Sequence, residues 1–150
     1  MRRLLLPLLA VGAAALTAFA SGPSADEEAV EAAVDDFVEA FYHAKPELLE
    51  RSVSAELKKM GYSRKEDGTY RGPHHMSFER ATGLAAEWNS EGQQGDDLRY
   101  EVEVFEVLDK IANAKVTAKW GIDYFQLVKE DGRWKIHHVL WQTHPPKSGE

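Results

Sequence analysis

An aspartate and a histidine on neighbouring predicted strands are the strongest candidates for chemistry in this sequence. The dipeptide Asp131-Gly132 lies between two alternating apolar and polar runs and is typical of a two-residue hairpin turn. A turn there makes Asp123 and His138 diagonal neighbours, about 7–8 Å apart at the backbone. A carboxylate at that position raises the pKa of a histidine and selects one of its tautomers, as a general acid or base requires.

The same register assigns the side chains of this hairpin to two faces. It pairs Phe125 with His138 and predicts that His138 lies inside the protein. One face of the hairpin is apolar and is expected to lie under the helices: Phe125, Leu127, Trp134, Ile136 and Leu140. The simpler alternative is a hydrogen-bonded core histidine, with Asp123 capping the end of a strand.

The opposite face is half polar and carries large aromatic side chains. Tyr124, His137 and Trp141 lie on it by parity, so we expect a homodimer interface there. The alternative is a solvated outer face on which lysine stems cover the aromatic rings.

Three helices are predicted before these strands. Ser24 and Glu27 form a capping box, and an apolar stripe follows it through Phe41. Pro46 opens a short second helix that ends near residue 51. Ser77 caps a third helix, which places Trp88 on its apolar face.

The second half of the sequence predicts an antiparallel sheet. Its four strands fall within residues 98–104, 112–119, 122–129 and 133–141, and short turns join them. Residues 54–75 show the weakest periodicity, with a small hairpin predicted between Tyr62 and Tyr70. Helices followed by an antiparallel sheet indicate an α+β domain with the helices on one face.

Composition excludes several classes of function. The net charge is −7, which argues against nucleic acid and anionic membrane surfaces as partners. The chain has no cysteine, and His74-His75 has no third ligand at a useful spacing, so no metal site is predicted. No glycine-rich phosphate loop and no serine nucleophile elbow is present, so we predict no cofactor.

Several segments carry a family resemblance. They are Ala55–Lys59, Met76–Phe78, Ala114–Val116, Asp123–Lys129, Asp131–Ile136 and Leu140-Trp141. Together they resemble the nuclear transport factor 2-like superfamily and, within it, the putative lumazine-binding group, over residues 26–143. The resemblance implies a curved sheet wrapped on helices into a cone, often dimeric, whose mouth admits a small molecule. The ligand contacts expected in such a cone are Phe41, Trp88, Trp120, Phe125 and Trp134.

Three functions follow from this resemblance. The first is a module that binds a small apolar molecule or serves as an accessory domain, without catalysis. The second is an isomerase or dehydratase that uses Asp123 and His138. The third is a protein-interaction domain whose cone is filled by its own side chains.

The N-terminus predicts export. Arg2 and Arg3 precede an uncharged run over residues 4–20, which ends in Ala18-Phe19-Ala20 and predicts cleavage before Ser21. Cleavage removes two of the 18 Lys and Arg residues and none of the 25 Asp and Glu residues, so the charge becomes −9. A retained membrane anchor is the alternative. Residues 21–25 are then a linker, residues 26–143 the domain and residues 144–150 a tail.

Overall fold

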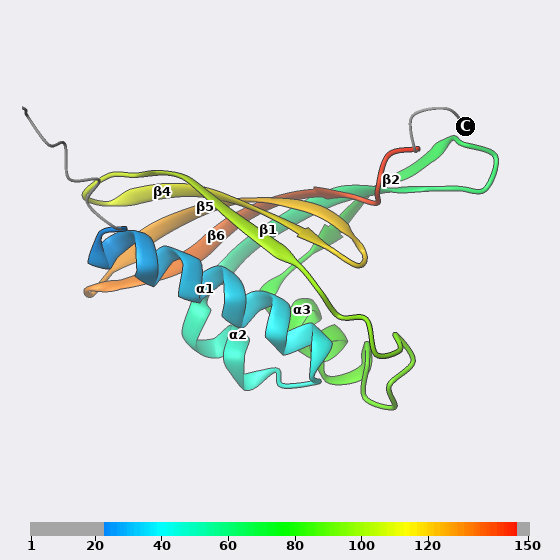
Figure 1. Ribbon diagram of the computed structural model, residues 1–150, viewed down its shortest axis with the longest axis horizontal. Coiled ribbons are helices and arrows are strands. Elements are labelled where there is room, and N and C mark those ends of the chain that lie inside the picture. Colours follow the sequence, from blue (N-terminus) through cyan, green and yellow to red (C-terminus); the bar gives the residue numbers. More distant parts are fainter. Residues whose placement is uncertain (1–22, 147–150) are drawn as a thin grey trace, which may run out of the picture.

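Six strands form one curved sheet in the computed structural model, which describes residues 23–146. The predicted signal segment lies outside the described residues. The strands are β1 (Val53–Arg64), β2 (Tyr70–Met76), β3 (Glu101–Val107), β4 (Ile111–Ala118), β5 (Gly121–Glu130) and β6 (Arg133–Gln142). Their order across the sheet is β2-β1-β6-β5-β4-β3, and only β1 and β6 run parallel (Figure 1).

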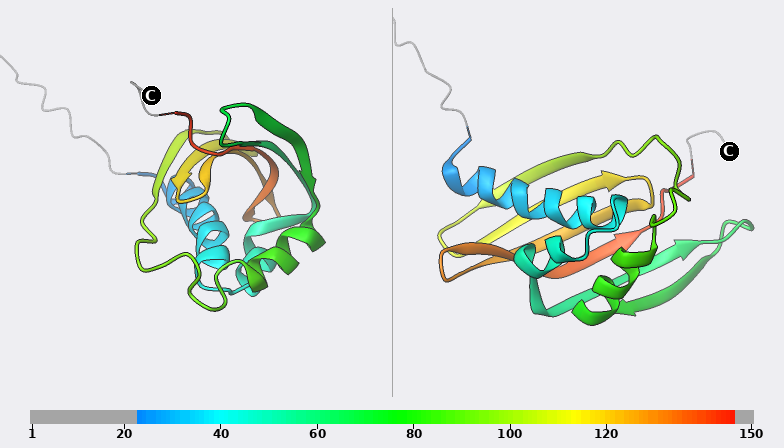
Figure 2. Two further views of the ribbon diagram at one scale, coloured as in Figure 1. Left: turned by 90° about the vertical axis from the view of Figure 1, so that its right-hand side faces the viewer. Right: turned by 90° about the horizontal axis from the view of Figure 1, so that it is seen from below.

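Three helices pack against the concave face of this sheet, as the α+β prediction requires. Helix α1 (Ala25–Tyr42) begins at the predicted capping box, in which the Ser24 hydroxyl accepts the Glu27 backbone N–H at 3.2 Å. Helix α2 (Glu47–Ser52) is short, and α3 (Phe78–Glu87) begins at Ser77. The sheet curls around α1, and the helices close its open side (Figure 2).

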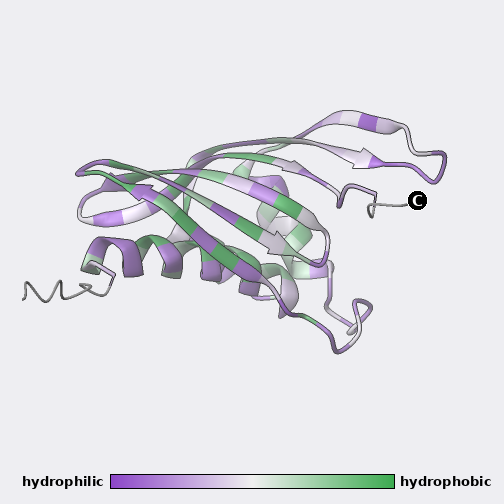
Figure 3. Ribbon diagram, turned by 45° about the horizontal axis from the view of Figure 1, so that its top comes forward, coloured by the Kyte–Doolittle hydropathy of each residue, from purple (hydrophilic) through white to green (hydrophobic). Residues whose placement is uncertain are grey.

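Hydrophobic and hydrophilic residues alternate along the strands (Figure 3), and most of the residues buried on the inner face are hydrophobic. On β4, the inward residues Ala112, Ala114, Val116 and Ala118 are all buried, and their small volume lets α1 approach the sheet. From α1, Phe37 packs edge-on against Phe125 of β5, with 5.2 Å between the ring centroids.

The predicted four-stranded meander is incomplete, because β1 and β2 precede it in sequence and extend the sheet. Residues 54–75, predicted to be the least regular, form this hairpin around a short turn. The alternation of apolar and polar residues is weak in β1, because two of its inward residues, Lys59 and Gly61, have no apolar side chain. Gly61, a residue type that sequence alone associates with a turn, lies within β1 and pairs with both neighbouring strands.

The β5–β6 hairpin follows the predicted register only near its turn. Asp131 and Gly132 adopt positive φ of 46° and 78°, and Leu127 pairs with Ile136 as expected. Beyond that pair the register shifts, and Gln126 pairs with His138. The one extra residue in β6 is a β-bulge, and it exchanges the faces of every later residue of the strand.

The bulge corrects the predicted position of His138. Val139 is buried at 1% exposure, Leu140 is 57% exposed, and His138 lies on the outer face. His138 therefore does not meet Asp123, which is fully buried on the inner face. The predicted acid–base pair is wrong because a period of two was extended through an irregularity that the sequence does not mark.

Two alanine variants test this inversion. Val139→Ala should lower the free energy of unfolding by about 2 kcal/mol, because it removes buried methyl groups and leaves a cavity. In the monomer, and so in dilute protein, Leu140→Ala should change it by less than about 0.5 kcal/mol, as expected for an exposed position. Urea unfolding followed by circular dichroism measures both, and a larger loss for Leu140→Ala would contradict the bulge.

Candidate functional site

A buried ion pair lies on the inner face of the sheet. The Lys59 ammonium of β1 donates to both carboxylate oxygens of Asp123 on β5, each at 3.0 Å. Lys59 is 7% exposed and Asp123 is fully buried. Because β6 separates β1 from β5, the Lys59 side chain passes beneath β6 to reach its partner.

Aromatic side chains surround this pair, and one of them donates a hydrogen bond to Asp123. The indole N–H of Trp120 donates to Asp123 Oδ2 at 3.0 Å. Lys59 Nζ lies 5.1 Å from the ring centroid of Phe37 and 5.5 Å from that of Trp141, within cation–π range. Burial lowers the pKa of Lys59, and the charge and hydrogen bonds of Asp123 oppose that decrease.

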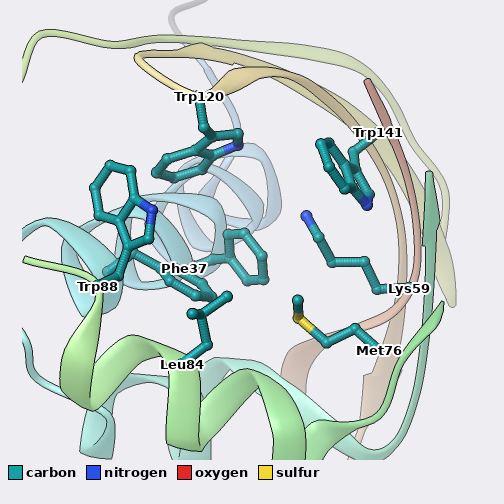
Figure 4. A pocket seen from close by; sticks show the side chains of 8 residues that line it. Phe37, Lys59, Met76, Leu84, Trp88, Trp120 and Trp141 are labelled. Atoms are coloured by element: carbon teal, nitrogen blue, oxygen red, sulfur yellow. The ribbon is translucent and has the colours of Figure 1, made fainter. Parts of the chain in front are cut away.

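Lys59 of this pair lines one side of a pocket between the sheet, α1 and α3. The pocket has a volume of about 130 Å³. Its lining is apolar apart from Lys59: Phe37, Phe41, Lys59, Met76, Leu84, Trp88, Trp120 and Trp141. Figure 4 shows the Lys59 side chain extending into the space between Trp120, Trp141 and Phe37.

Contacts between rings hold the walls of this pocket. Trp88 stacks on Tyr42 with 5.8 Å between centroids and meets Trp120 edge-on at 5.4 Å. The Tyr42 hydroxyl accepts the backbone N–H of Lys119 at 2.7 Å, next to Trp120 in the chain. The rings are therefore positioned by the end of α1 as well as by the sheet.

Trp141 enters the pocket because Gly61 faces it across β1 and β6. A Cβ added at Gly61 would lie 2.3 Å from Trp141 Cδ1, so no larger residue fits without displacing the indole. The Trp141 indole N–H is buried and has no hydrogen-bond partner within the described residues. An unpaired buried donor is costly, which marks this ring as part of a site rather than of the ordinary core.

The structure brings together some of the predicted ligand contacts. Phe41, Trp88 and Trp120 line the pocket. Phe125 instead lies in the core against Phe37, and Trp134 donates its indole N–H to Asp26 at 3.0 Å. Sequence reasoning missed Lys59, and the only available signal was a lysine at an otherwise inward position of β1.

The residues predicted for a dimer interface are divided between the two faces. Tyr124 is on the outer face at 53% exposure, and His137 contacts Glu130 at 2.7 Å. Trp141 lies inside the pocket, because the bulge places it on the inner face. The prediction that Trp141 belongs to the outer face is therefore wrong.

Neither a metal centre nor a membrane-spanning helix is found in the described part of the chain. Among residues 23–146, no group of three or more His, Asp or Glu side chains is arranged to hold a metal ion. No helix in the same range is long and apolar enough to cross a membrane.

Comparisons with known proteins agree with this architecture. A family model described as "Putative lumazine-binding" matches residues 25–142, and no curated protein matches the chain. An NTF2-like protein of unknown function from Silicibacter pomeroyi is 18% identical, with a TM-score of 0.62 over 78% of this chain and 94% of its own. An NTF2-like protein of unknown function from Shewanella baltica is 13% identical, with a TM-score of 0.62 over 83% of this chain and 100% of its own.

A third solved structure has the same fold. The ketosteroid isomerase-like protein from Erwinia carotovora atroseptica is 18% identical, with a TM-score of 0.53 over 79% of this chain and 96% of its own. These similarities confirm the predicted nuclear transport factor 2-like fold. They carry no assignment of ligand or reaction.

Removing one partner of the buried pair should destabilise the protein strongly. Asp123→Asn leaves the Lys59 ammonium buried without a counter-charge, and we expect a loss of about 3–5 kcal/mol in the free energy of unfolding. Lys58→Met, on the exposed face of β1, is the matched control and should cost little. Replacing the pair by Lys59→Met with Asp123→Leu should recover much of the loss.

The loss should depend on pH in a defined direction. Asp123→Asn lowers the pKa of Lys59 further, whereas a lysine in the unfolded chain has a pKa of about 10.4. Between these two pKa values the unfolded chain binds more protons than the folded chain does. The free energy of unfolding of the variant should therefore rise with pH. Urea unfolding at several values between about pH 6 and about pH 9 measures the slope of the free energy of unfolding against pH. A variant whose stability does not change over this range would contradict the role of Asp123.

Proposed function

The chain belongs to the putative lumazine-binding family, and on that premise we propose that it is an exported domain that binds a small molecule through a flat, uncharged ring, without catalysis. The observation that carries the proposal is the pocket, whose walls are three tryptophans and two phenylalanines around one buried ion pair. Such a combination of apolar walls with few polar groups is typical of small-molecule sites.

The size of the pocket limits the part of the ligand that it encloses. An apolar cavity of roughly 150 Å³ accommodates one benzene ring, and this pocket is close to that volume. The enclosed part of the ligand is therefore a single flat ring or one ring of a fused system. Aromatic walls bind such a ring through stacked and edge-on contacts.

The ion pair limits the charge and polarity of the enclosed ring. Asp123 neutralises Lys59, so an additional charge inside the pocket would have no partner. An ammonium group has three donors, and the two Asp123 oxygens occupy two of them. The third donor suits a carbonyl or ring-nitrogen acceptor. Lumazine, a flat heterocycle with two carbonyl groups, is one member of this class.

The two residues proposed for an isomerase or dehydratase do not lie together in the pocket. His138 is outside the pocket, and the Asp123 carboxylate is held by Lys59 and Trp120. We therefore favour binding over proton transfer. Export follows from the sequence of residues 1–20, and a purified native chain that still begins at Met1 would contradict it.

Titration with lumazine tests the binding proposal. Lumazine should shift the indole N–H resonances of Trp88 and Trp120 in NMR spectra, and native mass spectrometry of protein from its own host should show a retained small molecule. Trp88→Leu should weaken binding by about tenfold, since it removes a stacking surface. Tyr70→Leu removes an exposed ring that does not line the pocket and should leave binding unchanged. Absence of binding by lumazine and by benzyl alcohol, a neutral single-ring probe, would overturn the proposal.

We also propose a homodimer through an outer patch formed by Phe105, Tyr124 and Leu140. Each of these residues is more than half exposed, and the rings of Phe105 and Tyr124 lie 6.3 Å apart. Exposed apolar side chains gathered in this way are typical of an interface.

Substitution of the outer patch tests the dimer. Leu140→Lys should give a monomer in light scattering with an unchanged fold, because a charge is buried at the interface. Leu108→Lys, at an equally exposed leucine between β3 and β4, should leave the dimer intact. A wild-type protein that is already monomeric at high concentration would refute the interface.

A further inference from the structure

A second cleft adjoins the aromatic pocket along the β1–β2 hairpin. It has a volume of about 490 Å³ and, unlike the pocket, a largely polar lining. Its lining residues are Ser63, Arg71, Pro73, His74, His75, Met76, Arg80 and Trp141. Met76 and Trp141 also line the pocket, so the two spaces meet at these side chains.

The lining of the cleft can carry only positive charge. It includes two arginines and two histidines but no carboxylate, although the whole chain has a net charge of −7. Within residues 23–146, neither Arg71 nor Arg80 forms an ion pair with a carboxylate. A guanidinium group presents a planar set of donors that matches the oxygens of a carboxylate or phosphate.

Ser63 and His74 complete the polar lining. The Ser63 hydroxyl and His74 Nε2 are 2.9 Å apart, and the His74 ring stacks on Trp141 with 6.0 Å between centroids. A serine beside a histidine also suggests a nucleophile and its base. No carboxylate of the lining is present to orient His74, so the pair lacks the third member of a hydrolytic triad. The pair is better suited to donating a hydrogen bond to a ligand.

Strand geometry sets the distance between the two spaces. Lys59, Gly61 and Ser63 point inward in succession along β1. At about 3.3 Å per residue, Ser63 lies roughly 13 Å along the strand from Lys59. Met76 pairs with Lys59, and Trp141 pairs with Gly61. The near end of the cleft is therefore closer to Lys59 than Ser63 is, and a short flexible tail leads there from a ring in the pocket.

We propose that the cleft binds the oxyanion of a ligand whose ring occupies the aromatic pocket, with Arg71 and Arg80 as its principal contacts. The ligand is then an aromatic or heteroaromatic molecule with a carboxylate- or phosphate-bearing tail. This inference rests on the proposed binding function and extends it to the substrate class. The charge of the ligand lies on the tail, while the ring in the pocket is uncharged.

Three probes that share a phenyl ring and a four-carbon chain test the proposal. They are 4-phenylbutan-1-ol, which is neutral, 4-phenylbutyrate and 4-phenylbutyl phosphate. NMR titration of the wild-type protein should show binding of the two anions that is roughly threefold to tenfold tighter than binding of the alcohol, the range expected for partly exposed ion pairs. The preference should decrease in 0.5 M salt, at roughly the concentration that screens exposed charges. The stronger of the two anions identifies the carboxylate or the phosphate as the natural group.

Variants that replace one arginine by neutral glutamine identify the residues responsible for the preference for anions. Arg71→Gln and Arg80→Gln should each reduce the preference for the anions and leave the affinity for the alcohol unchanged. Arg64→Gln is the matched control, because Arg64 is an exposed arginine of the same hairpin and does not line the cleft. Equal affinity for all three probes, or an equal effect of Arg64→Gln, would overturn the oxyanion site and leave the proposed function standing. Failure of every probe to bind would instead contradict the aromatic pocket as a binding site.

Discussion

The site depends on one buried ion pair between strands that are not neighbours in the sheet. Lys59 pairs with Val139 in the β1–β6 ladder, and Asp123 pairs with Trp141 in the β5–β6 ladder, so the two charges meet across the inner face of β6. Burying two charges is expensive unless their geometry and remaining hydrogen bonds are favourable. Here both carboxylate oxygens accept from the ammonium, and Trp120 donates to the same carboxylate. The pair thereby links β1 to β5 beneath β6, and its lysine lines the pocket.

Much of the fold could be predicted from the sequence, because several local signals agree with the tertiary structure. Ser24 and Ser77 cap helices as their positions indicate, since a side-chain acceptor there satisfies the first backbone N–H groups. Asp131 and Gly132 form the expected turn because both adopt positive φ. The alternation of β4 is clear because its inward residues are small and apolar.

The candidate site could not be predicted in the same way, because its features depend on contacts distant in sequence. The extra residue in β6 has no local signature, and it inverted the predicted faces of His138, Leu140 and Trp141. Lys59 lies inward only because Asp123, 64 residues later, neutralises it. Gly61 permits the close approach of Trp141, a requirement that is visible only when β1 and β6 lie side by side (Figure 1). Local sequence patterns therefore predict the helix caps, the turn and the strand alternation. The pocket and its ion pair depend on contacts between residues that are distant in sequence.

The parallel pairing of β1 with β6 has a consequence for the order of folding. Lys59 and its ladder partner Val139 are 80 residues apart in the chain, and contacts of high sequence separation form slowly because a long loop must close first. The hairpins β3–β4 and β5–β6 close locally, so they can form before β1 docks beside them. The ammonium of Lys59 reaches Asp123 only after that docking. The folding chain would therefore acquire its meander first and its aromatic pocket last, so a complete pocket would report that folding is complete.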